Sequence, residues 1–120
     1  MNGVFLSLTL GRPSSKVGEG TLTPPTVAPV LTVSADFGSY IAVLEWTASN
    51  KTDSAGFSYS AQYSSDGVNF VEFYNGTGLT TNFSVGLGQE GLYYFKVIPL
   101  NDAGNGPDSN TASVILPGVI

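Results

Sequence analysis

The fold is decided by residues 87–101, which read Leu-Gly-Gln-Glu-Gly-Leu-Tyr-Tyr-Phe-Lys-Val-Ile-Pro-Leu-Asn. They begin with a glycine-rich turn, Gly86 to Gly91, and then alternate as a strand does, which places every second side chain on one face. That face carries Tyr93, Phe95, Val97 and Pro99. A leucine six residues before a strand-opening tyrosine fits a tyrosine corner, in which the ring is buried and its hydroxyl bonds to upstream backbone. We therefore expect Leu87 and Tyr93 to lock a crossover between two sheets.

Six further segments with strand-like composition surround this one, and no segment has a helical period. The segments are Pro29–Val33, Tyr40–Trp46, Phe57–Ser64, Val68–Tyr74, Thr81–Val85 and Thr111–Leu116. Seven short strands separated by Gly, Pro, Asn and Asp turns are typical of a β-sandwich. The side chains expected to pack in these six segments include Leu31, Val33, Ala42, Leu44, Trp46, Phe57, Tyr59, Ala61, Tyr63, Phe70, Phe73, Phe83 and Val85.

The turn after the central strand completes a family pattern. Leu87, then Tyr93-x-Phe95-x-Val97, then Asn-Asp-Ala-Gly-Asn-Gly-Pro over 101–107 and finally Ser109 resemble the fibronectin type III family. The resemblance covers about Pro25 to Pro117. It implies a seven-stranded immunoglobulin-like sandwich with a structural core that includes Trp46, Leu87, Tyr93, Phe95 and Val97. Pro99 departs from the family, which usually has alanine there. Since proline gives no N–H to a ladder, we expect a break or bulge near that strand's end.

The N-terminal residues do not belong to this resemblance. Residues 4–10 alternate in hydrophobicity, and Gly11–Pro25 is rich in Gly, Pro, Ser and Thr. We divide the chain into an extended arm at 1–25 and a sandwich at 26–120. The arm either packs on its own domain as an extra edge strand or adds a strand to a partner subunit. Its expected contact residues are Val4, Phe5, Leu6, Leu8 and Leu10.

Composition excludes several functions. The net charge is −5, and the four basic residues are scattered, so the clustered cations that nucleic acids and anionic membranes require are missing. The chain has neither cysteine nor histidine. Disulfides and thiolate chemistry are therefore excluded, and the commonest general base is absent. We expect no nucleic-acid partner and no membrane association.

Three patterns suggest chemistry, but each is better explained as a turn. Residues 86–91 match G-x-G-x-x-G, but a strand pattern follows them where a nucleotide site needs a helix. Asn101, Asp102, Asn105 and Asp108 place oxygen ligands in one loop without the spacing of a calcium site. The nine carboxylates fall mostly in turns, and a small filled sandwich offers them no deep cleft. We therefore predict no enzymatic activity, no cofactor and no metal.

The leading functional hypothesis is a structural phage virion protein, either a capsid decoration or a tail component. The first residues lack the positive region of a secretory signal, so we expect synthesis in the host cytoplasm without export. The arm is expected to anchor the chain to capsid or tail subunits in many copies. The loops Thr47–Gly56 and Asn101–Asn110 are expected to face outward or to contact neighbours.

The alternative hypothesis is a carbohydrate-binding or adhesion module from a larger secreted bacterial protein, which would place it outside the cell. Exposed rings would then stack on a surface glycan, and the candidates are Tyr40, Tyr74 and Tyr94. The same rings can also serve in cross-strand packing.

Overall fold

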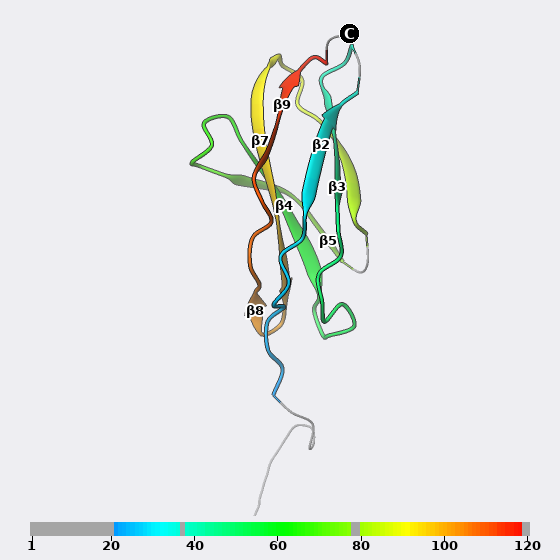
Figure 1. Cartoon of the computed structure of the whole chain (residues 1–120), viewed down its shortest axis with the longest axis vertical. Coiled ribbons are helices and arrows are strands. Elements are labelled where there is room, and N and C mark those ends of the chain that lie inside the picture. The colour runs from blue at the N-terminus through cyan, green and yellow to red at the C-terminus, as the bar shows by residue number, and fades with distance from the viewer. Residues whose placement is uncertain (1–20, 37, 78–79, 119–120) are drawn as a thin grey trace, which may run out of the picture.

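The computed structural model describes residues 21–36, 38–77 and 80–118, which form strands, turns and loops (Figure 1). No helix in this part of the chain is long and apolar enough to cross a membrane. The strands are β2 (Leu31–Ala35), β3 (Ile41–Trp46), β4 (Ser58–Ser64), β5 (Val71–Thr77), β6 (Asn82–Gly86), β7 (Gly91–Asn101), β8 (Gly104–Asn105) and β9 (Ala112–Leu116).

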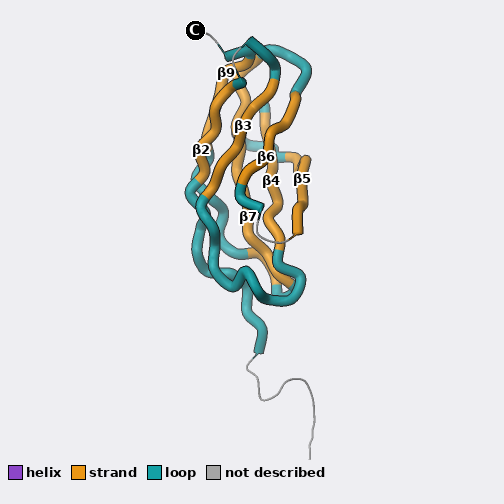
Figure 2. The backbone as a smooth tube through the Cα atoms, turned by 90° about the vertical axis from the view of Figure 1, so that its right-hand side faces the viewer, coloured by secondary structure: helices purple, strands orange, loops and turns teal. Residues whose placement is uncertain are grey.

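The strands form two antiparallel sheets that pack face to face (Figure 2). One sheet has the order β2-β3-β6. The other has the order β5-β4-β7-β8, and β9 also pairs with β7. The predicted all-β sandwich is confirmed. The described residues form eight strands where seven were expected, because the last expected strand is preceded by the separate, two-residue β8.

The core fills the space between the two sheets. Alternate residues of β3 are buried, as period-two geometry requires, and Trp46 is among them. The Trp46 ring meets the Tyr59 ring edge-on, with the ring centroids 5.5 Å apart. The buried cluster comprises Leu31, Ala42, Leu44, Trp46, Phe57, Tyr59, Ala61, Tyr93, Phe95, Val97 and Leu116. Leu87 packs against this cluster and is partly buried, so the five predicted core residues all contribute to the core.

The tyrosine corner is present at the start of β7. Tyr93 is only 8% exposed, and its hydroxyl donates a hydrogen bond to the backbone oxygen of Gln89 at 3.1 Å. The G-x-G-x-x-G stretch therefore forms the turn that leads into a strand, as the sequence pattern indicated. Its function is to hold the crossover from β6 to β7.

The break that we expected at Pro99 is absent from β7, which runs unbroken from Gly91 to Asn101 and pairs with β4 without a register shift. The reason is the direction in which Pro99 faces. The Val97 N–H donates to Ser109 Oγ, and the Val97 carbonyl accepts from the Ser109 N–H. The Pro99 carbonyl accepts from the Gly106 N–H on the same side of β7. Because backbone groups alternate along a strand, the missing N–H of Pro99 faces the gap between β8 and β9. The ladder with β4 loses nothing.

Phe70 does not join the core, contrary to our expectation. The strand begins at Val71 rather than Val68, because the Asp66 carboxylate accepts the backbone N–H groups of Val68 and Asn69, both at 2.8 Å, and holds them in a turn. Phe70 lies outside the strand, with the Lys96 ammonium 4.6 Å from its ring centroid. Phe73, the other aromatic residue expected here, packs against the core.

Candidate partner-docking end

Residues 21–30 form no strand, yet they are fixed to the lower end of the sandwich in Figure 1. Prolines interrupt the segment, so it cannot offer the regular N–H ladder of a strand. Side-chain oxygens bind its amides instead. The Thr26 N–H donates to Asn50 Oδ1, and the Val30 N–H donates to Thr47 Oγ1, both at 2.8 Å. The loop between β3 and β4 therefore holds this segment.

The last residue of β7 and the loop before β9 also hold the entering chain. The Asn101 side chain is buried, with 4% of the residue exposed, and its amide donates to the Thr23 carbonyl at 2.9 Å and to Ser54 Oγ at 3.1 Å. Asn110 both accepts from the Leu31 N–H at 2.8 Å and donates to the Leu31 carbonyl at 2.9 Å. The entering chain and both loops are thus connected by asparagine side chains.

Close packing supports these hydrogen bonds. Pro25 is buried against Gly106, where an added Cβ would lie 2.6 Å from the Pro25 carbonyl oxygen. Real Cβ atoms do not approach backbone oxygen so closely, so only glycine fits at position 106 without movement. The Lys51 ammonium also donates to the Thr23 hydroxyl. Residues 23–25 are therefore in contact with the sandwich.

Two expectations about this end stay predictions. The loops Thr47–Gly56 and Asn101–Asn110 were expected to face outward or to contact neighbours, and the structure adds that residues 21–30 of the same chain bond to both loops. The predicted contact residues of the arm lie outside the described residues, so their role stays a prediction, as does the boundary at residue 25. They are Val4, Phe5, Leu6, Leu8 and Leu10.

Sequence reasoning did not find the asparagines that hold this end. Asn50, Asn101 and Asn110 have the sequence context of loop residues, since asparagine favours turns for local reasons. Their partners lie 24, 78 and 79 residues away along the chain. No local spacing could have connected these groups.

The three tyrosine rings proposed for sugar stacking differ in their contacts with the rest of the sandwich. Tyr40 is 42% exposed. The Tyr74 ring stacks on Phe83 with centroids 4.2 Å apart, which covers one of its faces and links the edges of the two sheets. Gly67 lies against the Tyr94 ring. Cross-strand and cross-sheet packing therefore accounts for Tyr74.

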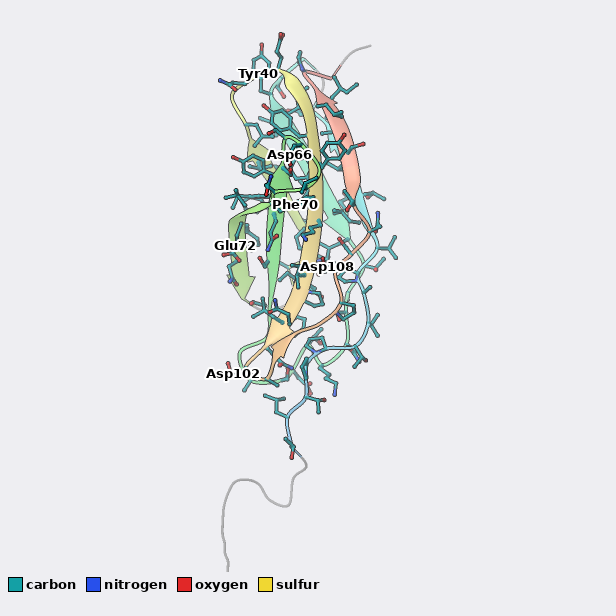
Figure 3. All side chains as sticks on the ribbon, turned by 90° about the vertical axis from the view of Figure 1, so that its left-hand side faces the viewer. Tyr40, Asp66, Phe70, Glu72, Asp102 and Asp108 are labelled. Carbon is teal, nitrogen blue, oxygen red and sulfur yellow. The ribbon has the colours of Figure 1, made fainter. Side chains whose placement is uncertain are left out.

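The acids do not converge. Asp66, Glu72, Asp102 and Asp108 are spread along the five-stranded sheet and its lower loop (Figure 3). In the loop considered for calcium, Asp108 pairs with the Lys96 ammonium at 3.1 Å, and Asn101 bonds to Thr23 and Ser54. Within residues 21–36, 38–77 and 80–118, no three acids gather as metal ligands.

A hollow of about 510 Å³ lies where β7 begins, at the other end of the sandwich, and no sequence pattern pointed to it. Its lining comes from the end of β4 and from the turn that enters β7, which are far apart in sequence. We refer to it as the corner hollow, because Tyr93 of the tyrosine corner is part of its wall.

Three solved structures illustrate what this fold is similar to. The FN1–FN3 domains of chicken CNTN1 match with a TM-score of 0.64 at 19% identity, over 78% of this chain and 33% of that one. An Fn3-like protein from Clostridium thermocellum matches with a TM-score of 0.61 at 20% identity, over 82% and 93% of the two chains. The fibronectin type-III domain of human fibronectin type III domain containing protein 3 matches with a TM-score of 0.55 at 27% identity, over 82% and 91%.

These likenesses establish a fibronectin type III-like fold. The chain spans a third of the CNTN1 fragment and more than nine tenths of each of the other two, so it corresponds to one such domain. No family model matches the sequence, and no curated protein matches it significantly. A fold of this type indicates a binding or structural module. Because the fold does not identify the partner, the surface of this chain has to indicate it.

Proposed function

We propose that this chain is a non-catalytic structural and binding module that docks to a protein partner through its N-terminal arm. The observation that carries the proposal is the attachment of residues 21–30 to both loops of the lower end. Residue 21 therefore lies at the end of the sandwich to which its segment is attached. Strand β9 ends at the opposite end (Figure 1). A partner bound through residues 1–20 would hold the sandwich by one end and leave the other end projecting.

The arm's sequence supports strand addition as the mode of docking. Val4, Leu6, Leu8 and Leu10 alternate with Phe5, Ser7 and Thr9, so an extended arm presents one fully apolar face and one mixed face. An extended segment that joins the edge of a partner's sheet gains main-chain hydrogen bonds, and its alternate side chains give specificity. Residues 21–30 favour this mode, because a segment that is already fixed to the sandwich loses less conformational freedom when a partner binds next to it.

The partner class that we propose is the repeated subunit of a phage capsid or tail, with many copies of the chain on one particle. Under this proposal the chain acts in the virion after synthesis in the host cytoplasm. The supporting features are the apolar face of the arm and the elongated sandwich, in which residue 21 and the end of β9 lie at opposite ends. Neither feature depends on chemistry at an active site.

The test is sedimentation of lysates from the cells in which the protein is naturally made. The chain is given a C-terminal tag so that it can be detected. We expect the full chain to sediment with a large particle and a chain that begins at residue 21 to stay at the top of the gradient. Its unfolding midpoint should match that of the full chain, because the contacts of residues 21–30 are retained.

A matched pair of variants separates the apolar face from mere length. Leu6→Asp with Leu8→Asp places two charges on the expected docking face, and Ser7→Asp with Thr9→Asp adds the same charge to the opposite face. We expect only the first pair to release the chain from the particle. Equal sedimentation of both variants with the full chain would contradict docking through the arm. Co-sedimentation with a particle that is not a virion would keep the docking role and reject the phage setting.

A further inference from the structure

The corner hollow is lined by both aromatic and polar side chains. Tyr63 and Tyr93 contribute aromatic surface to its wall, and the exposed side chains Ser65, Gln89 and Glu90 stand at its rim. The two ring centroids are 6.5 Å apart. A volume of about 510 Å³ falls in the range of sites that bind small molecules or single side chains.

The hollow also exposes an open stretch of strand edge. The last pair between β4 and β7 is Ser64 with Tyr94, after which β4 ends and the chain turns away. Backbone groups alternate along β7, and those of Val97 and Pro99 face the segment between β8 and β9. The N–H and carbonyl of Leu92 must therefore face the β4 side, beyond the end of that strand. No described strand pairs with Leu92 on this side.

The charge at the hollow selects the occupant. Glu90 is the one ionisable carboxylate among the lining residues, and none of these residues is basic. In the described part of the chain, Lys96 is paired with Asp108, and Lys51 bonds to Thr23 at the lower end. A cation that lies over a tyrosine ring and approaches a carboxylate is attracted by both groups. Among residues 21–36, 38–77 and 80–118, neither lysine reaches this site.

We propose that the corner hollow binds an extended segment of a partner protein that carries a lysine or arginine side chain. One residue of the segment pairs with Leu92, and the next residue, which points to the other face, directs its cation toward Tyr63 and Glu90. This surface lies at the end of the sandwich remote from residue 21, so the proposal is independent of docking through the arm.

The experiment is an amide NMR titration of the full chain with the blocked peptide acetyl-Thr-Val-Lys-Val-Thr-amide. We expect shifts at Leu92 and at Ser65. The same peptide with glutamine in place of lysine should bind about two- to fivefold more weakly, the effect of one exposed ion pair. A peptide N-methylated at both valines should not shift Leu92, because it cannot donate to the strand edge.

Two variants of the protein test the role of Glu90. Glu90→Gln should remove the preference for lysine, whereas Glu45→Gln, an exposed acid on the other sheet, should leave it unchanged while changing the net charge equally. Equal effects of the two variants would reduce the interaction to general charge attraction and overturn the proposal. Shifts at Leu92 with a neutral disaccharide but none with the peptides would make the hollow a glycan site, which also overturns it.

Discussion

The hydroxyl of Tyr93 donates a 3.1 Å hydrogen bond to the backbone carbonyl of Gln89, four residues upstream. This bond closes the turn that carries the chain from the three-stranded sheet to the five-stranded sheet. The Tyr93 ring is buried in the core at the same time, so one side chain joins the crossover to the packing of the sandwich. The corner hollow is built on this fixed turn.

Tyr93→Phe should keep the packing of the ring and lose only the hydrogen bond. We expect the free energy of unfolding to fall by about 1 kcal/mol, the usual net contribution of one such bond. Urea unfolding monitored by Trp46 fluorescence measures the change. Tyr94→Phe, on the outer face of the same strand, is the control and should change stability less. An unchanged unfolding midpoint for Tyr93→Phe would show that the turn holds without this bond.

Ser109 closes the gap that Pro99 faces. Its Oγ accepts the buried N–H of Val97 at 2.8 Å, and its own N–H donates to the Val97 carbonyl at 2.8 Å. Ser109→Ala leaves that N–H buried without a partner, which should cost about 1–3 kcal/mol in the free energy of unfolding. Ser113→Ala on the exposed face of β9 should have little effect. Equal stability of the two variants would contradict the bridging role of Ser109.

Gly106 should tolerate no side chain, because Pro25 occupies the space beside it. Gly106→Ala forces the entering segment away and should lower the free energy of unfolding by about 1–3 kcal/mol, as overpacking does. Gly86→Ala is the matched control, since its nearest neighbour would be Ile41 Cγ1 at 4.0 Å. A chain that begins at residue 31 should lose the difference between the two alanine variants. If the difference persists in that shorter chain, Pro25 is not its cause.

The Asp66 turn predicts a pH dependence of stability. The backbone N–H groups of Asn69 and Val68, together with the Ser64 hydroxyl, hold the pKa of Asp66 well below its ordinary value of 3.8. The folded state therefore favours the charged carboxylate, and this stabilisation is present above the ordinary pKa and lost as the pH falls below it. Unfolding midpoints at about pH 6 and about pH 3 should differ less for Asp66→Asn than for the natural chain. An identical difference in both proteins would rule out this contribution.

Local patterns predicted the centre of the fold and missed its ends. Alternation at Tyr93, Phe95 and Val97 is a property of adjacent residues, so the core strand and the corner could be identified directly. The Gly, Pro, Ser and Thr content of Gly11–Pro25 predicts a linker or extended arm. The burial of Pro25 could not be predicted in this way, because it depends on the small size of Gly106, which is distant in sequence. The corner hollow depends on where β4 ends relative to β7, and single-strand patterns do not encode that register.

The most direct test of the account is residue-resolved hydrogen exchange of the backbone amides in residues 21–31. The central claim is that asparagine and threonine side chains of the loops fix this segment to the sandwich. We predict slow exchange at Thr26, Val30 and Leu31, whose amides donate to side-chain oxygens. Asn50→Ala should release Thr26 while leaving the β7 amides protected. Rapid exchange at all three amides in the natural chain would contradict the claim and leave the arm without a fixed starting point.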